Sequence, residues 1–306
     1  MRRTLRSIDF QHLLRAGWIS LVKRAARTYV VGPELTHALR VREDLCKQGF
    51  ATTLGFRNRE EDQPQQTVDA YCRALNAIAQ TRQNCYLSVK APALKFAPEL
   101  LAQVVRQGRQ YGIGIHFDSL GPETADPTFA FIAAALPQSV QLGCTLPGRW
   151  TRSQNDADWV VESGLAVRVV KGEWAESALS EPDLRAGFLA VVDRLAGRAR
   201  HVAVATHDPP LAREALQRLR ATGTPCDLEL QVGFPVRSVL RVAGEMGVPV
   251  RFYISYGDAW PPYRLSQAKQ NPRVCWWFCR DLLFGRAFRM PHQSSLNFLR
   301  RNVVQD

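Results

Sequence analysis

The chain has 306 residues, of which 46% are hydrophobic and 22% are charged, close to the averages of globular proteins. No stretch approaches the roughly 20 consecutive apolar residues that span a bilayer, which argues against an integral membrane protein. Seven cysteines, odd in number and irregularly spaced, indicate neither a disulfide framework nor a zinc site. We therefore expect a cytoplasmic protein without a bound metal.

The amino-terminal region, residues 1–48, is expected to be helical and to pack on the main domain. It is basic, but Asp9, Gln11 and His12 interrupt it before an apolar run of signal-peptide length. The net charge of +12 is concentrated near the two ends of the chain. Such ends either carry solvated arginines on surface helices or contact an anionic membrane at its inner face. Since no aromatic interleaving or nucleic-acid motif accompanies the charge, we expect no nucleic-acid partner.

Eight short β-rich runs follow, separated by longer amphipathic stretches. They lie at residues 50–54, 85–89, 113–117, 139–143, 166–170, 202–206, 227–231 and 249–253. The helix candidates between them include 97–111, 182–198, 209–221 and 234–246. The alternation predicts parallel strands joined by helices.

Eight β/α units close naturally into a barrel, whereas an open doubly wound sheet would require a glycine-rich phosphate turn that this chain lacks. We therefore predict an α/β protein with a TIM-type (β/α)₈ barrel over residues 49–290, amino-terminal helices, a carboxyl-terminal helical extension and a tail at 291–306. In this fold the chemistry lies at the carboxyl ends of the strands.

Polar residues stand at those strand ends. Lys90 follows the run 85–89, and Arg168 lies within 166–170. Burying either cation costs several kcal/mol unless it is paired, so each is either a structural ion pair, with a neighbour such as Asp118, or part of a site for anionic groups. His207 admits three interpretations: a ligand, a base or a hydrogen-bonded core histidine. A metal site is disfavoured, because no second histidine or carboxylate lies three or four residues from His207.

Six motifs, in the same order along the chain, resemble those of the proline dehydrogenase family. They are LSVKAPAL (87–94), IHFDSL (115–120), VRVVKGEW (167–174), VATHDP (204–209), LELQVGF (228–234) and VRFYISYGDAWPPYRLSQAKQNP (250–272). The resemblance covers about residues 29–290 and implies an FAD-dependent dehydrogenase on a (β/α)₈ barrel.

The resemblance also implies roles for individual residues. Arg168 is expected near flavin N5, where a guanidinium stabilises the charge that arrives with hydride. The other implied FAD-binding residues are Val170, Lys171, Gly172, Thr206, His207 and Gln231. The implied catalytic residues are Arg168, Lys90, Asp118 and Tyr253, and Lys90, Tyr253 and Tyr263 are expected to contact the substrate.

The pocket departs from the family pattern. Ser266 and Gln267 stand where the family has two arginines that clamp the substrate carboxylate, and Glu173 replaces a small residue. Gly143 and Thr145 replace a glutamine and a tyrosine. We expect Glu173, Ser266 and Gln267 to contact the substrate, a small amine or amino acid that is free or carried on a partner, with a quinone or oxygen as electron acceptor. The alternatives are a genuine L-proline dehydrogenase with an unusual clamp, and a barrel with weakened catalysis that binds flavin or a partner.

Overall fold

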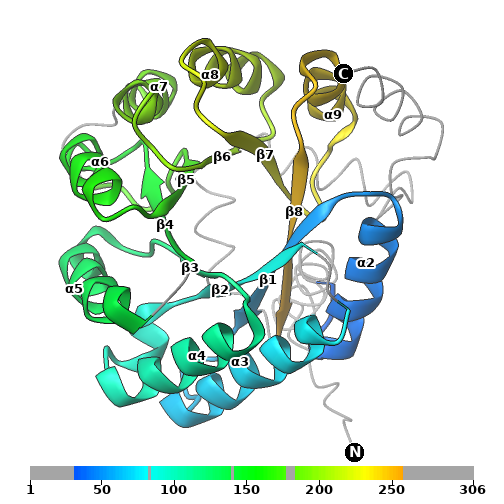
Figure 1. Ribbon diagram of the computed structural model, residues 1–306, viewed down its shortest axis with the longest axis vertical. Helices are drawn as coiled ribbons and strands as arrows, with labels where there is room; N and C mark the ends of the chain where they lie inside the picture. The colour runs from blue at the N-terminus through cyan, green and yellow to red at the C-terminus, as the bar shows by residue number, and fades with distance from the viewer. Residues whose placement is uncertain (1–30, 82–83, 139–140, 177–182, 258–306) are drawn as a thin grey trace, which may run out of the picture.

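The computed structural model describes residues 31–81, 84–138, 141–176 and 183–257, and these form a ring of helices around a closed parallel barrel (Figure 1). The strands are β1 (Ala51–Arg57), β2 (Cys85–Val89), β3 (Ile115–Phe117), β4 (Leu142–Pro147), β5 (Ala166–Val170), β6 (Val202–Ala205), β7 (Cys226–Gln231) and β8 (Val250–Gly257). Each strand pairs with the next along the chain, and β8 pairs with β1 from Ala51–Arg251 to Arg57–Gly257. The predicted (β/α)₈ barrel is confirmed.

A helix follows each of the first seven strands, and one helix precedes β1. The helices are α2 (Leu35–Lys47), α3 (Pro64–Ala79), α4 (Pro98–Tyr111), α5 (Ala125–Ala135), α6 (Ser153–Glu162), α7 (Leu184–Leu195), α8 (Pro209–Ala221) and α9 (Arg237–Met246). Short 3₁₀ turns lie at Ala91–Leu94, Pro122–Thr124 and Leu136–Gln138. Within the described ranges, no helix has the length and hydropathy needed to cross a membrane.

Local sequence explains where the helices begin and end. The Asp208 carboxylate accepts a hydrogen bond from the Leu211 amide, and Pro209 and Pro210 occupy the first turn of α8, where a missing N–H costs nothing. Gly112 ends α4 with a φ of 65°, a left-handed conformation that glycine adopts without strain. Signals of this kind depend only on neighbouring residues, so the sequence alone can indicate where a helix begins or ends.

Six strands differ from their predicted bounds, and the differences are largest in β4 and β8. The run predicted at 139–143 was placed too early, because β4 spans Leu142–Pro147 and pairs with β5 from Gly143–Ala166 to Pro147–Val170. The run predicted at 249–253 stopped too soon, because β8 continues along β1 as far as Gly257. In both cases pairing with a neighbouring strand extends a segment that its own residues do not mark as extended.

The strands bury an apolar face outward and a polar face inward. Leu54, Leu87 and Val204 are fully buried in the core between barrel and helices. The alternating positions, such as Thr53, Arg168 and Glu229, are also buried and bond to one another from different strands across the barrel interior. Because side chains alternate along a strand, the same strands form both the apolar outer core and the charged interior, each from every second residue.

Candidate functional site at the carboxyl ends of the strands

Arg168 lies at the centre of a buried polar network inside the barrel. Its Nε and Nη2 donate to the two carboxylate oxygens of Glu229 at 2.8 and 2.9 Å, and its Nη1 donates to Asp118 Oδ1 at 2.7 Å. Burial opposes the charge, but Glu229, Tyr86 and Asp118 together raise the pKa of Arg168 well above its ordinary value. The arginine therefore stays cationic although its side chain is only 5% exposed.

Asp118 follows β3 and gathers donors from three strands. Its Oδ1 accepts from Ser88 Oγ at 2.5 Å as well as from Arg168, and its Oδ2 accepts from the Tyr253 hydroxyl at 2.8 Å. Burial raises the pKa of Asp118, but Arg168, Lys90 and these hydrogen bonds outweigh it and the pKa falls below its usual value. Asp118 is thus an ionised carboxylate at neutral pH.

Lys90, at the end of β2, completes this group. Its ammonium donates to the Phe56 carbonyl at 2.6 Å and lies 3.9 Å from Asp118 Oδ2. Burial lowers the pKa of Lys90 to about 8, only partly opposed by Asp118. The lysine therefore begins to lose its proton just above neutral pH.

Glu229 on β7 is a site residue that the sequence interpretation missed. Besides Arg168, it accepts hydrogen bonds from Thr53 Oγ1 at 2.9 Å and from the Tyr86 hydroxyl at 3.1 Å. The available signal was its position two residues before Gln231, which places both side chains on the same face of the strand. A buried carboxylate on a strand requires a partner, and Arg168 is that partner for Glu229.

His116 was missed as well, and it explains Gly143. The His116 ring stacks on Tyr86 with centroids 5.5 Å apart, and its Nε2 lies 3.1 Å from Thr145 Oγ1. A Cβ at position 143 would lie 2.5 Å from His116 Nδ1, so glycine there leaves space for the imidazole. Burial, with the nearby arginines, lowers the pKa of His116 well below its ordinary value and keeps the ring neutral.

Tyr253 on β8 lies directly beside Arg168, with the guanidinium carbon 5.0 Å from the tyrosine ring centroid. Its hydroxyl comes so near β1 that a Cβ on Gly55 would lie 2.1 Å away. Arg168, Lys90, Asp118 and Tyr253, the four residues expected to be catalytic, therefore meet at one place.

A second group of predicted residues lies in the loops after β5, β6 and β7. The Lys171 ammonium donates to Asp208 Oδ2 at 3.1 Å, and both side chains are about 40% exposed. The Thr206 hydroxyl accepts from the Asp208 amide at 3.3 Å. Gly172 has a φ of 93°, and a Cβ there would lie 2.9 Å from Pro147 Cβ. Val170 ends β5, and its carbonyl accepts from the Gly148 amide at 2.7 Å.

His207 connects two of these loops. Its Nε2 accepts from the Gln231 amide at 3.0 Å, and its Nδ1 therefore carries the proton that is donated to the Pro235 carbonyl, 3.2 Å away. Burial lowers the pKa of His207 to about 4, so the ring is neutral at physiological pH. With both nitrogens bonded to backbone and the ring packed against Phe234, 4.9 Å between centroids, the imidazole holds the Gln231 backbone in place.

The remaining predicted residues fall elsewhere. The Glu173 carbonyl accepts from Arg149 Nη1 at 2.9 Å, which ties the loop after β5 to the loop after β4. Tyr263, Ser266 and Gln267 lie outside the described residues.

The donor set suits a flavin dinucleotide. Arg168 supplies a cation within the barrel, while Lys171 and Thr206 supply an ammonium and a hydroxyl beside the amino terminus of α8, where the helix dipole favours anions. Gly172 keeps the intervening backbone free of a side chain. These groups match an anionic pyrophosphate joined to a ring system that accepts charge.

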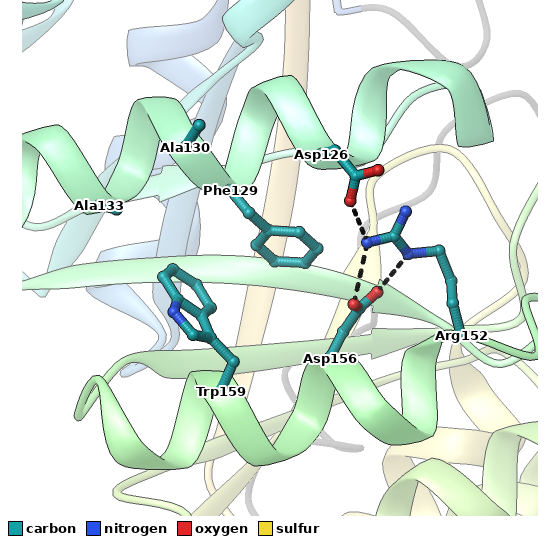
Figure 2. A pocket seen from close by; sticks show the side chains of 7 residues that line it. All are labelled: Asp126, Phe129, Ala130, Ala133, Arg152, Asp156 and Trp159. Carbon is teal, nitrogen blue, oxygen red and sulfur yellow. Dashed lines mark hydrogen bonds and ion pairs between the residues drawn. The ribbon is translucent and has the colours of Figure 1, made fainter.

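A separate surface pocket of about 280 Å³ lies between α5 and α6 in the outer layer of helices (Figure 2). Its Arg152 is bonded to both Asp126 and Asp156, and the Phe129 and Trp159 rings meet edge to face, 5.2 Å apart. The pocket is formed by helix side chains and includes none of the residues at the strand ends.

Comparison with solved structures agrees with the resemblance to the proline dehydrogenase family at the level of the fold. Proline utilization A (PutA) from Bdellovibrio bacteriovorus matches 82% of this chain with a TM-score of 0.70 and 17% identity. PutA from Bradyrhizobium japonicum matches 91% with a TM-score of 0.59 and 16% identity. This chain covers only 33% and 31% of those proteins, about a third of their length. No family model and no curated protein matches the sequence. The chain therefore has the (β/α)₈ fold of one region of the PutA proteins.

Proposed function

We propose that this protein is an FAD-dependent oxidoreductase of the proline dehydrogenase type. It would remove hydride from a carbon next to nitrogen in an amine, an amino acid, or a carboxyl-modified or carrier-bound prolyl-like group. A quinone or oxygen would then accept the electrons. The observation that carries the proposal is the buried, permanently charged Arg168 in the middle of β5, which lies with Asp118, Lys90 and Tyr253.

Each residue has a role in this chemistry. Bound FAD supplies the hydride acceptor, held by Lys171, Gly172, Thr206 and the His207–Gln231 pair. Arg168 places a fixed positive charge where negative charge accumulates, so little reorganisation is needed when hydride leaves the substrate. Asp118 stabilises the positive charge that develops on the substrate nitrogen. Lys90, whose pKa is about 8, is suited to exchange a proton with the substrate near neutral pH.

The substrate class rests on Ser266 and Gln267, which carry no charge to fix a carboxylate. Hydrogen bonds to charged groups contribute about 1.5–3 kcal/mol each, so the absence of two arginines costs on the order of 3–6 kcal/mol for free proline. That is roughly 10²- to 10⁴-fold in kcat/KM. Substrates with a neutral or absent carboxylate lose little.

The test begins by reconstituting the protein with FAD and recording its visible spectrum. Anaerobic bleaching then compares L-proline, prolinamide and pyrrolidine as substrates, and the two compounds that lack a carboxylate should be oxidised faster than proline. The matched variant Ser266→Arg/Gln267→Arg should restore the preference for proline. Equal or better oxidation of proline by the wild type would identify a genuine L-proline dehydrogenase instead. A protein that takes up neither FAD nor FMN would leave only a partner-binding barrel.

A further inference from the structure

We propose that Glu229 is the positioning residue of this site, and that it holds the Arg168 guanidinium in one orientation toward the flavin. The inference rests on the proposed function. Glu229 and Arg168 are 61 residues apart in sequence and meet in a two-point contact, Nε to Oε2 and Nη2 to Oε1. A bidentate contact fixes the plane of the guanidinium as well as its position, which a single hydrogen bond does not.

The hydrogen bonds that Glu229 accepts occupy both of its carboxylate oxygens. Each of its oxygens accepts two hydrogen bonds: Oε1 from Thr53 and Arg168, and Oε2 from Tyr86 and Arg168. Its side chain is 2% exposed. A carboxylate that accepts four hydrogen bonds and has almost no solvent access has little capacity to bind a substrate.

Asp118, the second carboxylate bonded to Arg168, differs from Glu229 in both exposure and hydrogen bonding. Asp118 is 15% exposed, and among the residues that the structure describes its Oδ2 accepts a hydrogen bond from the Tyr253 hydroxyl, with the Lys90 ammonium 3.9 Å away. Asp118 is therefore less completely enclosed than Glu229. We therefore assign the two acids different roles: Glu229 orients the arginine, and Asp118 interacts with the substrate.

The anchor is itself held from several strands. Thr53 on β1 and Tyr86 on β2 fix the carboxylate. The Tyr86 ring lies near two guanidinium carbons, 6.0 Å from that of Arg168 and 4.2 Å from that of Arg251. Arg251 in turn bonds to Asp227, Asn84 and the Thr52 carbonyl at the opposite end of the barrel. The orientation of Arg168 is thus fixed by β1, β2 and β7 together.

The experiment measures the two-electron midpoint potential of bound FAD, because this quantity reports charge near the flavin and needs no substrate. Arg168→Met should lower the potential by at least a tenfold change in the reduction equilibrium, about 30 mV. Glu229→Gln should also lower it, because the released arginine turns toward Asp118. The direct effect of removing a negative charge has the opposite sign and would raise the potential.

A double-variant cycle isolates the positioning effect. In the Arg168→Met background, Glu229→Gln should no longer lower the potential, since no arginine remains to be misplaced and only the direct effect of the removed charge is left. Tyr86→Phe and Glu229→Asp keep the buried charge and should give smaller shifts of the same sign. If circular dichroism shows that Glu229→Gln does not fold, the potentials of these two variants test the positioning role instead.

The outcomes separate this inference from the proposed function. If the wild type takes up no FAD, the proposed function fails. If Arg168→Met lowers the potential while Glu229→Gln raises it in both backgrounds, or leaves it unchanged, only the positioning role is overturned.

Discussion

Buried charge dominates this site at the scale of single residues. An isolated ion inside a protein costs several kcal/mol, and removing one member of a buried pair typically costs about 3–5 kcal/mol. Arg168, Asp118 and Glu229 satisfy one another through short hydrogen bonds. Lys90 is less well compensated, because its nearest carboxylate oxygen is 3.9 Å away. The charge of Lys90 therefore changes with pH just above neutrality.

The first prediction concerns Lys90. Its pKa is about 8 in the folded protein and near 10.5 when exposed, so between these values the unfolded chain binds more protons. The free energy of unfolding should therefore rise with pH from about 8 to 10.5. Lys90→Met should remove this rise in urea unfolding measured between pH 7.5 and 10, whereas Lys95→Met, at an exposed position, should keep it. An unchanged pH slope in Lys90→Met would show that the lysine is not desolvated.

At the scale of elements, two kinds of contact join neighbouring units of the barrel. Ion pairs connect successive outer helices, for example Arg194 on α7 with Asp158 on α6. Such half-exposed pairs contribute only about 0–1 kcal/mol each. The bonds of the half-buried His207 to Gln231 and Pro235 matter more, because they join the end of β6 to the loop that leads into α9.

The second prediction is that His207→Phe lowers the free energy of unfolding by about 1–3 kcal/mol at pH 7, since the Gln231 amide is left without an acceptor. The pKa of His207 is about 4 in the folded state and near 6.5 when exposed, so wild-type stability should fall as pH drops from about 6.5 to 4. The variant should lack this part of the loss. Gln231→Ala, which keeps the backbone amide, is the matched control. Equal stability of His207→Phe and wild type in chemical denaturation would contradict the assignment.

At the scale of the whole molecule, one closed barrel carries every described site residue. The loops after β5, β6 and β7, which contain the residues proposed to bind FAD, grow from a single continuous core. A ligand held by all three loops binds only the folded barrel and therefore stabilises it as a unit.

The third prediction is that FAD at 100 times its dissociation constant stabilises the protein by about 2.7 kcal/mol. Lys171→Ala should weaken FAD binding while changing the stability of the FAD-free protein by less than about 1 kcal/mol, because the Lys171–Asp208 pair is half exposed. Thermal unfolding over an FAD titration measures both quantities. If Lys171→Ala leaves the FAD-dependent shift of the midpoint unchanged, Lys171 does not contact the cofactor.

The sequence by itself determined the order of strands and helices, the closed barrel and the convergence of Arg168, Lys90, Asp118 and Tyr253. The strand order and the barrel follow from local periodicity, helix caps and the presence of eight β/α units, whereas the choice of these four residues as one site came from the resemblance to the proline dehydrogenase family. Only the tertiary structure decided that Glu229 is the partner of Arg168, that Gly143 makes room for His116, and that both nitrogens of His207 are bonded to backbone. Alternation along a strand tells which side chains face inward. Which of them meet at one level depends on the stagger between strands, which is set by the closure of the whole barrel.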